Sequence, residues 1–157
     1  MQRLDVATCR KETYSKPAAY PKVAPGKLTD DLFRRDFTIN AMAVSISPAT
    51  FGRLIDPFKG KADLSRGCLR VLHDRSFVDD PSRILRSIRF LKRFDLRWDA
   101  HTRTLMLQAV ASGFLGELNV GRLERELGHM FDEPNPRACF DALAELLDDA
   151  EKISHGK

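Results

Sequence analysis

Long hydrophobic runs and clustered cysteines are both missing from this 157-residue sequence. No apolar stretch approaches the roughly 20 residues that cross a bilayer, and the opening MQRLDVATCRK resembles neither a signal peptide nor a transit peptide. The three cysteines, Cys9, Cys68 and Cys139, lack the CxxC spacing and the neighbouring histidines of a zinc site. We therefore expect free thiols and a cytoplasmic protein that does not enter a membrane.

The excess of positive over negative charge is small. There are 26 lysines and arginines against 22 aspartates and glutamates, which gives a formal net charge of +4. Hydrophobic residues make up 43% of the chain, an ordinary proportion for a globular domain. The length predicts one domain, or one domain with part of another, with enough residues for a hydrophobic core. A slightly basic chain suits a polyanionic partner without requiring one.

The stretch VDDPSRILRSIRFLKRF at 78–94 predicts an amphipathic helix. Its DDP opening places an acid at the cap and a proline in the first turn. Ile84, Ile88 and Leu91 then follow at the spacing i, i+4, i+7, which places them on one face of a helix. We expect this apolar face to pack into the core.

A second stripe on this helix is polar. Asp80, Arg83 and Arg86 are spaced by three, and Arg89 continues the stripe loosely. A carboxylate followed by planar guanidiniums suits a ligand with hydrogen-bonding edges and negative charge, such as a nucleoside triphosphate. An amphipathic helix with a solvated basic face has the same pattern, so this segment alone leaves both interpretations open.

Strands and helices are mixed before about residue 75, and only helices are expected after residue 95, which predicts an α+β fold. Residues 14–29, rich in proline and small residues, are expected to form a loop. The expected strands or extended links are residues 4–8, 41–46, 53–55 and 69–72, with the two middle strands forming a hairpin on the sheet of the first. The expected helices, besides the arginine-rich one, are a capped turn at 29–33, a short helix at 59–65, and longer helices at 98–110, 121–131 and 136–147.

Four sequence blocks resemble the class II tRNA nucleotidyltransferases and poly(A) polymerases, the template-independent enzymes that add CCA, or parts of it, to tRNA 3′ ends. The blocks are LDVATCRKETY at 4–14, RRDFTINAMA at 34–43, LIDPFKGKADL at 54–64 and RVLHDRSFVDDPSRILRSIRF at 70–90. The RRD and DDPxRxLR blocks, in that order, are together very specific. The likeness runs from about residue 3 to about residue 148.

The resemblance implies a division of the α+β fold. Residues 1–75 correspond to the C-terminal part of a nucleotidyltransferase head, with short antiparallel or mixed strands and helices. Residues 76–150 correspond to an all-helical neck and body that bind RNA and nucleotide. Residues 151–157 are expected to form a frayed tail.

The resemblance also implies roles for the RRD block. Arg35 and Asp36 correspond to residues that lie beside the nucleotide sugar and help to shape the metal site, with Asn40 as a supporting amide. An arginine and an aspartate at these positions could instead form a purely structural pair that fixes a turn.

For the arginine-rich helix, the resemblance implies base selection. Asp80 and Arg83 correspond to the acid and the arginine that offer their edges to the incoming base, so that protein replaces a nucleic-acid template. A carboxylate and a guanidinium have the acceptors and donors needed to pair with cytosine or adenine. Arg86 and Arg89 are then expected to point toward the triphosphate.

Two further blocks have counterparts in the family. Residues 56–63 resemble a flexible segment between head and neck. The alternative interpretation is a structural turn. Arg122 and Glu126 resemble the last family motif, and as an i,i+4 pair they could simply brace helices.

The main difference from the family is that this chain lacks the magnesium ligands. The family has a Gly-Gly phosphate loop followed by an Asp-x-Asp that holds two Mg²⁺ ions, and this chain contains neither pattern. Asp5 resembles a third acidic residue near the metals, and one carboxylate is a poor substitute for three. The chain is therefore expected to be a fragment, a split-gene half completed by an upstream polypeptide, or a remnant.

Two classes of function remain open. The chain belongs either to an enzyme that transfers C and/or A from CTP or ATP to the tRNA 3′ end, or to a non-catalytic module that binds nucleotide or RNA. The residues of these blocks resemble those of tRNA-end enzymes more than those of poly(A) polymerases, although a fragment of a poly(A) polymerase is also possible on the sequence. The choice between CCA, CC, A and poly(A) addition is open as well.

The absence of the first head strands predicts that the chain associates or is poorly soluble when expressed alone. Such a sheet exposes an unpaired edge and apolar surface. Analytical ultracentrifugation over a concentration series should show self-association. A monomer with a cooperative melting transition would contradict this expectation.

Overall fold

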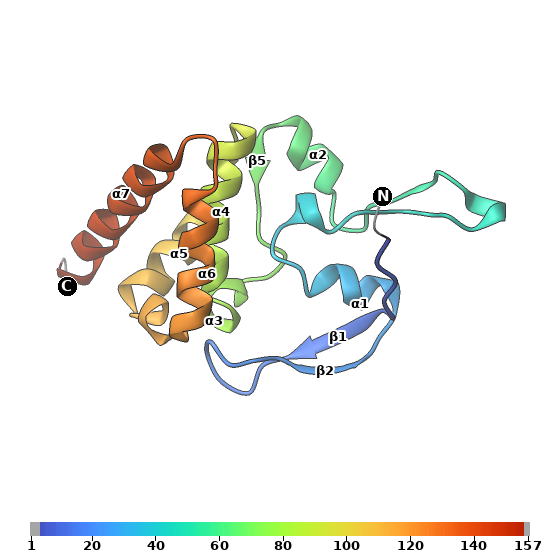
Figure 1. Ribbon diagram of the computed structural model, residues 1–157, viewed down its shortest axis with the longest axis horizontal. Helices are drawn as coiled ribbons and strands as arrows, with labels where there is room; N and C mark the ends of the chain where they lie inside the picture. Colours follow the sequence, from blue (N-terminus) through green and yellow to red (C-terminus); the bar gives the residue numbers. More distant parts are fainter. Residues whose placement is uncertain (1–3, 156–157) are drawn as a thin grey trace.

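The computed structural model describes residues 4–155, with most strands in the N-terminal half and the long helices in the C-terminal half (Figure 1). The strands are β1 (Arg10–Thr13), β2 (Lys22–Pro25), β3 (Ala43–Val44), β4 (Leu54–Ile55), β5 (Cys68–Leu69) and β6 (Arg97–Trp98). The helices are α1 (Leu28–Phe33), α2 (Gly60–Ser65), α3 (Ser76–Asp79), α4 (Ser82–Phe94), α5 (Ala100–Ala111), α6 (Val120–Phe131) and α7 (Pro136–His155). Short 3-10 turns are η1 (Thr38–Asn40), η2 (Pro48–Thr50) and η3 (Phe114–Glu117). The predicted α+β fold is confirmed.

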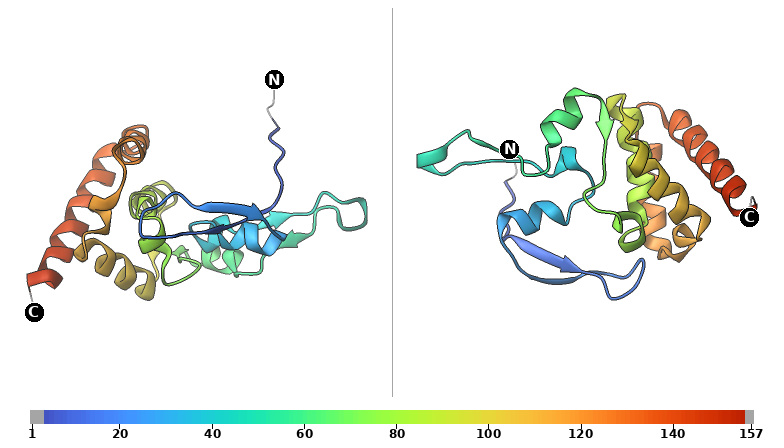
Figure 2. Two further views of the ribbon diagram at one scale, coloured as in Figure 1. Left: turned by 90° about the horizontal axis from the view of Figure 1, so that it is seen from below. Right: turned by 180° about the vertical axis from the view of Figure 1, so that it is seen from behind.

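The strands form three separate two-stranded ladders within residues 4–155. β1 and β2 are antiparallel, β3 and β4 form an antiparallel hairpin, and β5 runs parallel to β6. The hairpin predicted within 41–55 is confirmed, but it does not share a sheet with the first strand. In Figures 1 and 2 it projects from the end of the molecule opposite α7, and Val44, Ile46 and Phe51 on it are exposed.

The strand predicted for residues 4–8 is wrong, because the first strand begins at Arg10. Leu4 is 87% exposed and Val6 is 90% exposed, so the alternation has no buried face. Alternation predicts which side chains share a face, whereas a ladder also needs a neighbouring strand. Figure 2 shows this segment projecting away from the body of the molecule.

The loop predicted for residues 14–29 is only partly correct. β2 lies inside this range and pairs with β1, with Lys22 opposite Thr13, so the loop shortens to residues 14–21. Pro25 stands at the end of β2, where a missing N–H costs little. The local composition of prolines and small residues does not reveal a pairing with a distant strand.

The amphipathic pattern of the arginine-rich segment is confirmed. α4 runs through the helical half with Ile84, Leu85 and Ile88 fully buried, and α6 and α7 pack against it. The short helix α3 precedes α4, so the predicted helix opening becomes a turn between two helices. With this face buried, Arg83 and Arg86 lie on the side of α4 that contacts Arg34 and Asp36 of the N-terminal half.

Two helix ends differ from the prediction. Residue 98 lies in β6, paired with Leu69, and α5 begins only after Asp99, whose carboxylate accepts a hydrogen bond from Thr102 N at 3.2 Å. α7 continues to His155, so the part of the expected frayed tail up to that residue is helical. Residues 156–157 lie outside the described residues.

Other expectations concern the cysteines and the membrane. All three cysteines are free, as predicted, and burial raises the pKa of the Cys139 thiol. Along residues 4–155, none of the helices has both the length and the apolar character to cross a bilayer.

The 56–63 block forms a tightly bound turn and helix. Asp56 caps α2 by accepting hydrogen bonds from Gly60 N at 2.7 Å and Lys61 N at 3.0 Å. The buried Asp63 accepts from Thr38 Oγ1 at 2.8 Å. At Gly60 an added Cβ would lie 2.1 Å from the Thr38 carbonyl oxygen, so only glycine lets α2 approach η1 this closely.

We predict that Gly60→Ala lowers the free energy of unfolding by about 1–3 kcal/mol, because the new methyl group forces α2 and η1 apart. Gly128→Ala is the matched control, since a Cβ there meets nothing within 4 Å. That control should be neutral or slightly stabilising because alanine favours helix. Urea denaturation of both variants makes the comparison, and equal stabilities would contradict the close approach.

Candidate functional site

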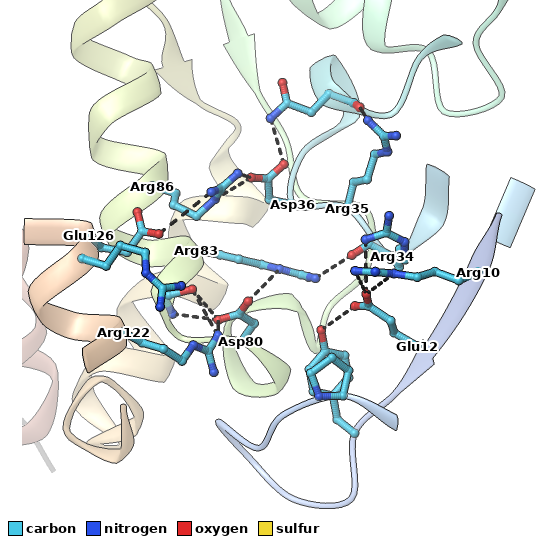
Figure 3. A pocket seen from close by; sticks show the side chains of 15 residues that line it. Arg10, Glu12, Arg34, Arg35, Asp36, Asp80, Arg83, Arg86, Arg122 and Glu126 are labelled. Carbon is cyan, nitrogen blue, oxygen red and sulfur yellow. Dashed lines mark hydrogen bonds and ion pairs between the residues drawn. The ribbon is translucent and has the colours of Figure 1, made fainter. Parts of the chain in front are cut away.

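A cavity of about 650 Å³ lies where the two halves of the chain meet (Figure 3). Seven arginines and four acidic residues line it, so its walls carry an excess of positive charge. The lining residues are Arg10, Glu12, Tyr14, Pro21, Arg34, Arg35, Asp36, Asn40, Asp80, Ser82, Arg83, Arg86, Arg122, Arg125 and Glu126. Six of the eight predicted site residues are among them.

Asp36 is a buried residue that lines this cavity, and it accepts four hydrogen bonds. Oδ1 accepts from Phe37 N at 3.0 Å and from Asn40 Nδ2 at 2.8 Å. Oδ2 accepts from Arg86 Nε at 2.8 Å and Arg86 Nη2 at 2.5 Å. Burial alone would raise the pKa of Asp36, but the charge of Arg86 and the bond from Asn40 outweigh it and hold the pKa below 3.8. Asp36 therefore orients Arg86 and Asn40 as a fixed anion.

Arg35 does not pair with Asp36. Its Nη1 donates to the Asn40 carbonyl oxygen at 3.1 Å, and its Nη2 lies 3.3 Å from Asp31 Oδ2. The side chain is 40% exposed, yet Nε is buried without a hydrogen-bond partner among the residues that the structure describes. Asp31 also binds Arg34, and these bonds hold its pKa below 3.8 although burial opposes them.

Asp80, in the turn between α3 and α4, and Arg83, in the first turn of α4, both line the cavity. Asp80 Oδ1 accepts from Ser82 N at 3.1 Å and from Ser82 Oγ at 2.5 Å, and it is ion-paired with Arg122. Arg83 Nε lies 4.0 Å from Asp80 Oδ2. The other end of the Arg83 guanidinium is fixed by Ser76 Oγ at 2.7 Å and the Arg34 carbonyl oxygen at 2.8 Å.

The remaining two predicted residues lie elsewhere. Arg89 donates to Glu133 Oε1 at 3.0 Å and to Glu126 Oε2 at 3.3 Å, so it joins α4 to α6 and to the turn before α7. Asp5 is exposed and does not line the cavity. The roles proposed for these two residues stay predictions.

Sequence reasoning missed the wall contributed by β1 and the residue after it. Glu12 accepts hydrogen bonds from Arg10 Nε at 3.1 Å, Tyr14 OH at 3.1 Å and Arg34 Nη1 at 3.2 Å. Burial raises the pKa of Tyr14 to about 12, so the phenol stays protonated and donates. The alternation Arg-x-Glu-x-Tyr was the available signal, because it places all three side chains on one face of a strand.

The described carboxylates do not fit a two-metal site. Residues 4–155 contain no group of three histidine, cysteine, aspartate or glutamate side chains placed to hold a metal ion. Both oxygens of Asp36 are already occupied by N–H donors, and such donors occupy the lone pairs that a cation would need.

The chain is similar to known tRNA nucleotidyltransferases along most of its length. Residues 1–70 match the family model described as the poly A polymerase head domain. The chain is 42% identical over 146 residues to the A-adding tRNA nucleotidyltransferase of Halalkalibacterium halodurans, covering 92% of this chain and 34% of that protein. It is 50% identical to the A-adding enzyme of Aquifex aeolicus over 80% of this chain and 15% of that protein. Against the CC-adding enzyme of Deinococcus radiodurans the identity is 37% over 84% of this chain and 34% of that protein.

Solved structures agree with this likeness. A CCA-adding enzyme in its apo form II superposes with a TM-score of 0.88 at 46% identity, covering 93% of this chain and 34% of that chain. The Thermotoga maritima CCA-adding enzyme complexed with tRNA gives a TM-score of 0.74 at 49% identity, covering 80% of this chain and 30% of that chain. The chain thus spans about a third or less of the length of these relatives.

Asp36→Asn tests the buried anion. We expect this substitution to lower the free energy of unfolding by about 1.5–3 kcal/mol at neutral pH, because the hydrogen bonds from Arg86 become weaker. Since the folded pKa of Asp36 lies below its usual 3.8, its contribution is complete above that pH and disappears as the pH falls through the folded value.

Urea denaturation from pH 7 to pH 3 should therefore show a constant gap between wild type and variant that narrows below about pH 4. Asp141→Asn is the control, because Asp141 is an exposed acid on α7. A gap that stays the same at low pH would contradict the role of the Asp36 charge.

Proposed function

The chain belongs to the tRNA nucleotidyltransferase and poly(A) polymerase family, and from this premise we propose that it forms the nucleotide-selecting part of an enzyme that extends the 3′ end of tRNA. Its substrates are CTP or ATP and a tRNA with an incomplete end. The proposal covers the whole enzyme, because the chain spans only part of the length of its relatives.

The meeting of Asp80 and Arg83 on an arginine-lined wall is the observation that carries this proposal. Cytosine and adenine both present an amino donor beside a ring-nitrogen acceptor on their pairing edge. A carboxylate accepts from the amino group, and a guanidinium donates to the ring nitrogen. Arg83 is suited to this task because Ser76 and Arg34 fix its orientation before any nucleotide arrives.

The charge of the cavity supports binding of the triphosphate. Arg86 is held by Asp36 with its side chain partly exposed, and Arg122 and Arg125 reach the cavity from α6. Planar guanidiniums match phosphate oxygens with two parallel hydrogen bonds. Arg35 and Asp36 are assigned to the sugar side of the nucleotide, with Asn40 as a supporting amide. The Asn40 side chain donates to Asp36, and its backbone carbonyl oxygen accepts from Arg35 Nη1.

Nucleotidyltransferases of this family depend on metal ions, and we propose Mg²⁺ as the ion. Residues 4–155 contain no group of three side chains placed to hold a metal ion, so we propose that the main ligands come from carboxylates outside them. We propose that an upstream polypeptide with a Gly-Gly loop and an Asp-x-Asp completes the head. The residues that line the cavity then bind and orient the nucleotide.

Addition of A, either alone or as the last step of CCA addition, is the proposed reaction. The A-adding relatives are 42% and 50% identical to this chain and two solved CCA-adding enzymes are 46% and 49% identical, against 37% for the CC-adding relative. A second candidate is a non-catalytic module that binds nucleotide or RNA. The lack of a metal cluster among residues 4–155 favours that candidate if no completing segment exists.

Nucleotide incorporation tests the proposal. The chain is mixed with Mg²⁺, labelled ATP or CTP, and tRNAs that end before CCA, after CC, or intact, with and without a segment that carries Gly-Gly and Asp-x-Asp. Labelled A on the tRNA ending in CC, only when the segment is present, is the expected result. Nucleotide binding without incorporation in either mixture would favour the binding module.

Arg83→Ala in the completed enzyme should reduce the preference for ATP and CTP over GTP and UTP by about tenfold, with little effect on tRNA affinity. The loss follows from removal of the donor to the base. Arg103→Ala is the control, because Arg103 pairs with Asp149 on the helical surface and does not line the cavity. Unchanged nucleotide selectivity in Arg83→Ala would refute the assignment.

A further inference from the structure

The two oxygens of the Asp80 carboxylate have different surroundings. Oδ1 accepts hydrogen bonds from Ser82 N, from Ser82 Oγ and from Arg122 Nη2. Oδ2 has, within residues 4–155, only the Arg83 Nε at 4.0 Å. A carboxylate oxygen has about two lone-pair sites, so three donors leave Oδ1 without capacity for a ligand. Oδ2 is the oxygen that can still accept a strong hydrogen bond.

Arg122 is itself held in place from several sides. Its Nη1 donates to the Ala18 carbonyl oxygen at 3.3 Å, and its guanidinium lies 5.7 Å from the centroid of the Tyr20 ring. Its backbone N–H donates to the Asn119 cap of α6 at 3.2 Å. The side chain is only 13% exposed. Arg122 is therefore a fixed support that reaches from α6 to Asp80, as Figure 3 shows.

We propose, on the basis of the function proposed above, that Arg122 is a positioning residue for base selection. Together with Ser82 it binds Oδ1 and so turns Oδ2 of Asp80 toward the incoming base. Oδ2 then accepts a hydrogen bond from the amino group of cytosine or adenine. Uracil and guanine present a carbonyl oxygen at that place, and two opposed acceptors repel each other.

The geometry explains why a fork of donors is needed at this position. One end of the Arg122 guanidinium binds Asp80, while the other end binds the Ala18 carbonyl, so the plane of the group is fixed. A lysine has a single ammonium on a flexible stem and cannot hold both partners in one plane. Without the arginine, only the two donors of Ser82 hold Oδ1, so the carboxylate is fixed less firmly and Oδ1 regains capacity to face the base.

A purely structural Arg122 is the competing interpretation. If Arg122 only braced α6 against the turn before α4, its removal would lower stability and weaken the binding of all nucleotides equally. If it positions Asp80, its removal changes the ratio between bases. The ratio of affinities is therefore the quantity to measure.

Equilibrium binding of CTP, UTP, ATP and GTP to the full chain, by titration calorimetry with Mg²⁺, tests the proposal without any need for turnover. Wild type is expected to prefer CTP over UTP and ATP over GTP. Arg122→Ala should lower both preferences by about tenfold, and Arg122→Lys should lower them less. Ser82→Ala removes a donor to the same oxygen and should act in the same direction. Arg137→Ala, at a 91% exposed side chain on α7, is the control that should leave the preferences unchanged.

The results for wild type and for the variants distinguish a failure of the proposed function from a failure of the role inferred for Arg122. If wild type binds none of the four nucleotides, the proposed function fails and this inference fails with it. If wild type prefers CTP and ATP but Arg122→Ala keeps both ratios, Arg122 is only a brace and the proposed function stands. A thermal melt checks folding, and should Arg122→Ala be unfolded, the ratios of Ser82→Ala decide in the same way.

Discussion

The ion pair between Asp36 and Arg86 joins the two halves of the chain across a separation of 50 residues, and the cavity depends on it. A buried carboxylate loses its hydration, and this loss is offset only where enough donors surround it. Asp36 has four donors, from its own turn and from α4. The same anion that fastens η1 to α4 thereby sets the positions of Asn40 and Arg86 at the edge of the cavity. The ion-pair network extends to α6, because Glu126 Oε1 lies 4.0 Å from Arg86 Nη1.

Local patterns predicted the helices of this fold well because each helix contains its own signals. The apolar spacing of α4 predicted the burial of Ile84 and Ile88. The strands with distant partners were less predictable, as in the ladder of β5 and β6, which holds two residues per strand and pairs Cys68 with Arg97. The strand expected at residues 4–8 shows the limit, because its alternation was real but nothing covers it among the described residues.

The candidate site could be predicted from the sequence only where the resemblance supplied the positions. Asp80, Arg83 and Arg86 all reach the cavity, but Arg89 on the same predicted stripe does not. Residues three apart on a helix differ by about 300°, so the stripe turns by about 60° at every step. Over two steps this carries Arg89 away from the cavity and toward Glu126 and Glu133. The link from Arg122 to Asp80 spans 42 residues and leaves no local pattern.

The ion pairs of Glu133 at the C-terminal end of α4 restrict how this sequence can vary in length. Glu133, with a side chain only 2% exposed, binds Arg89 and Arg93, which lie about one turn apart on α4. Asp80 and Arg83 fix the other end of the same helix. Insertion or deletion of one residue between Arg83 and Arg89 would rotate one end relative to the other by about 100°. Both ends could not then keep their partners, so the ion pairs at its two ends fix the length of this helix.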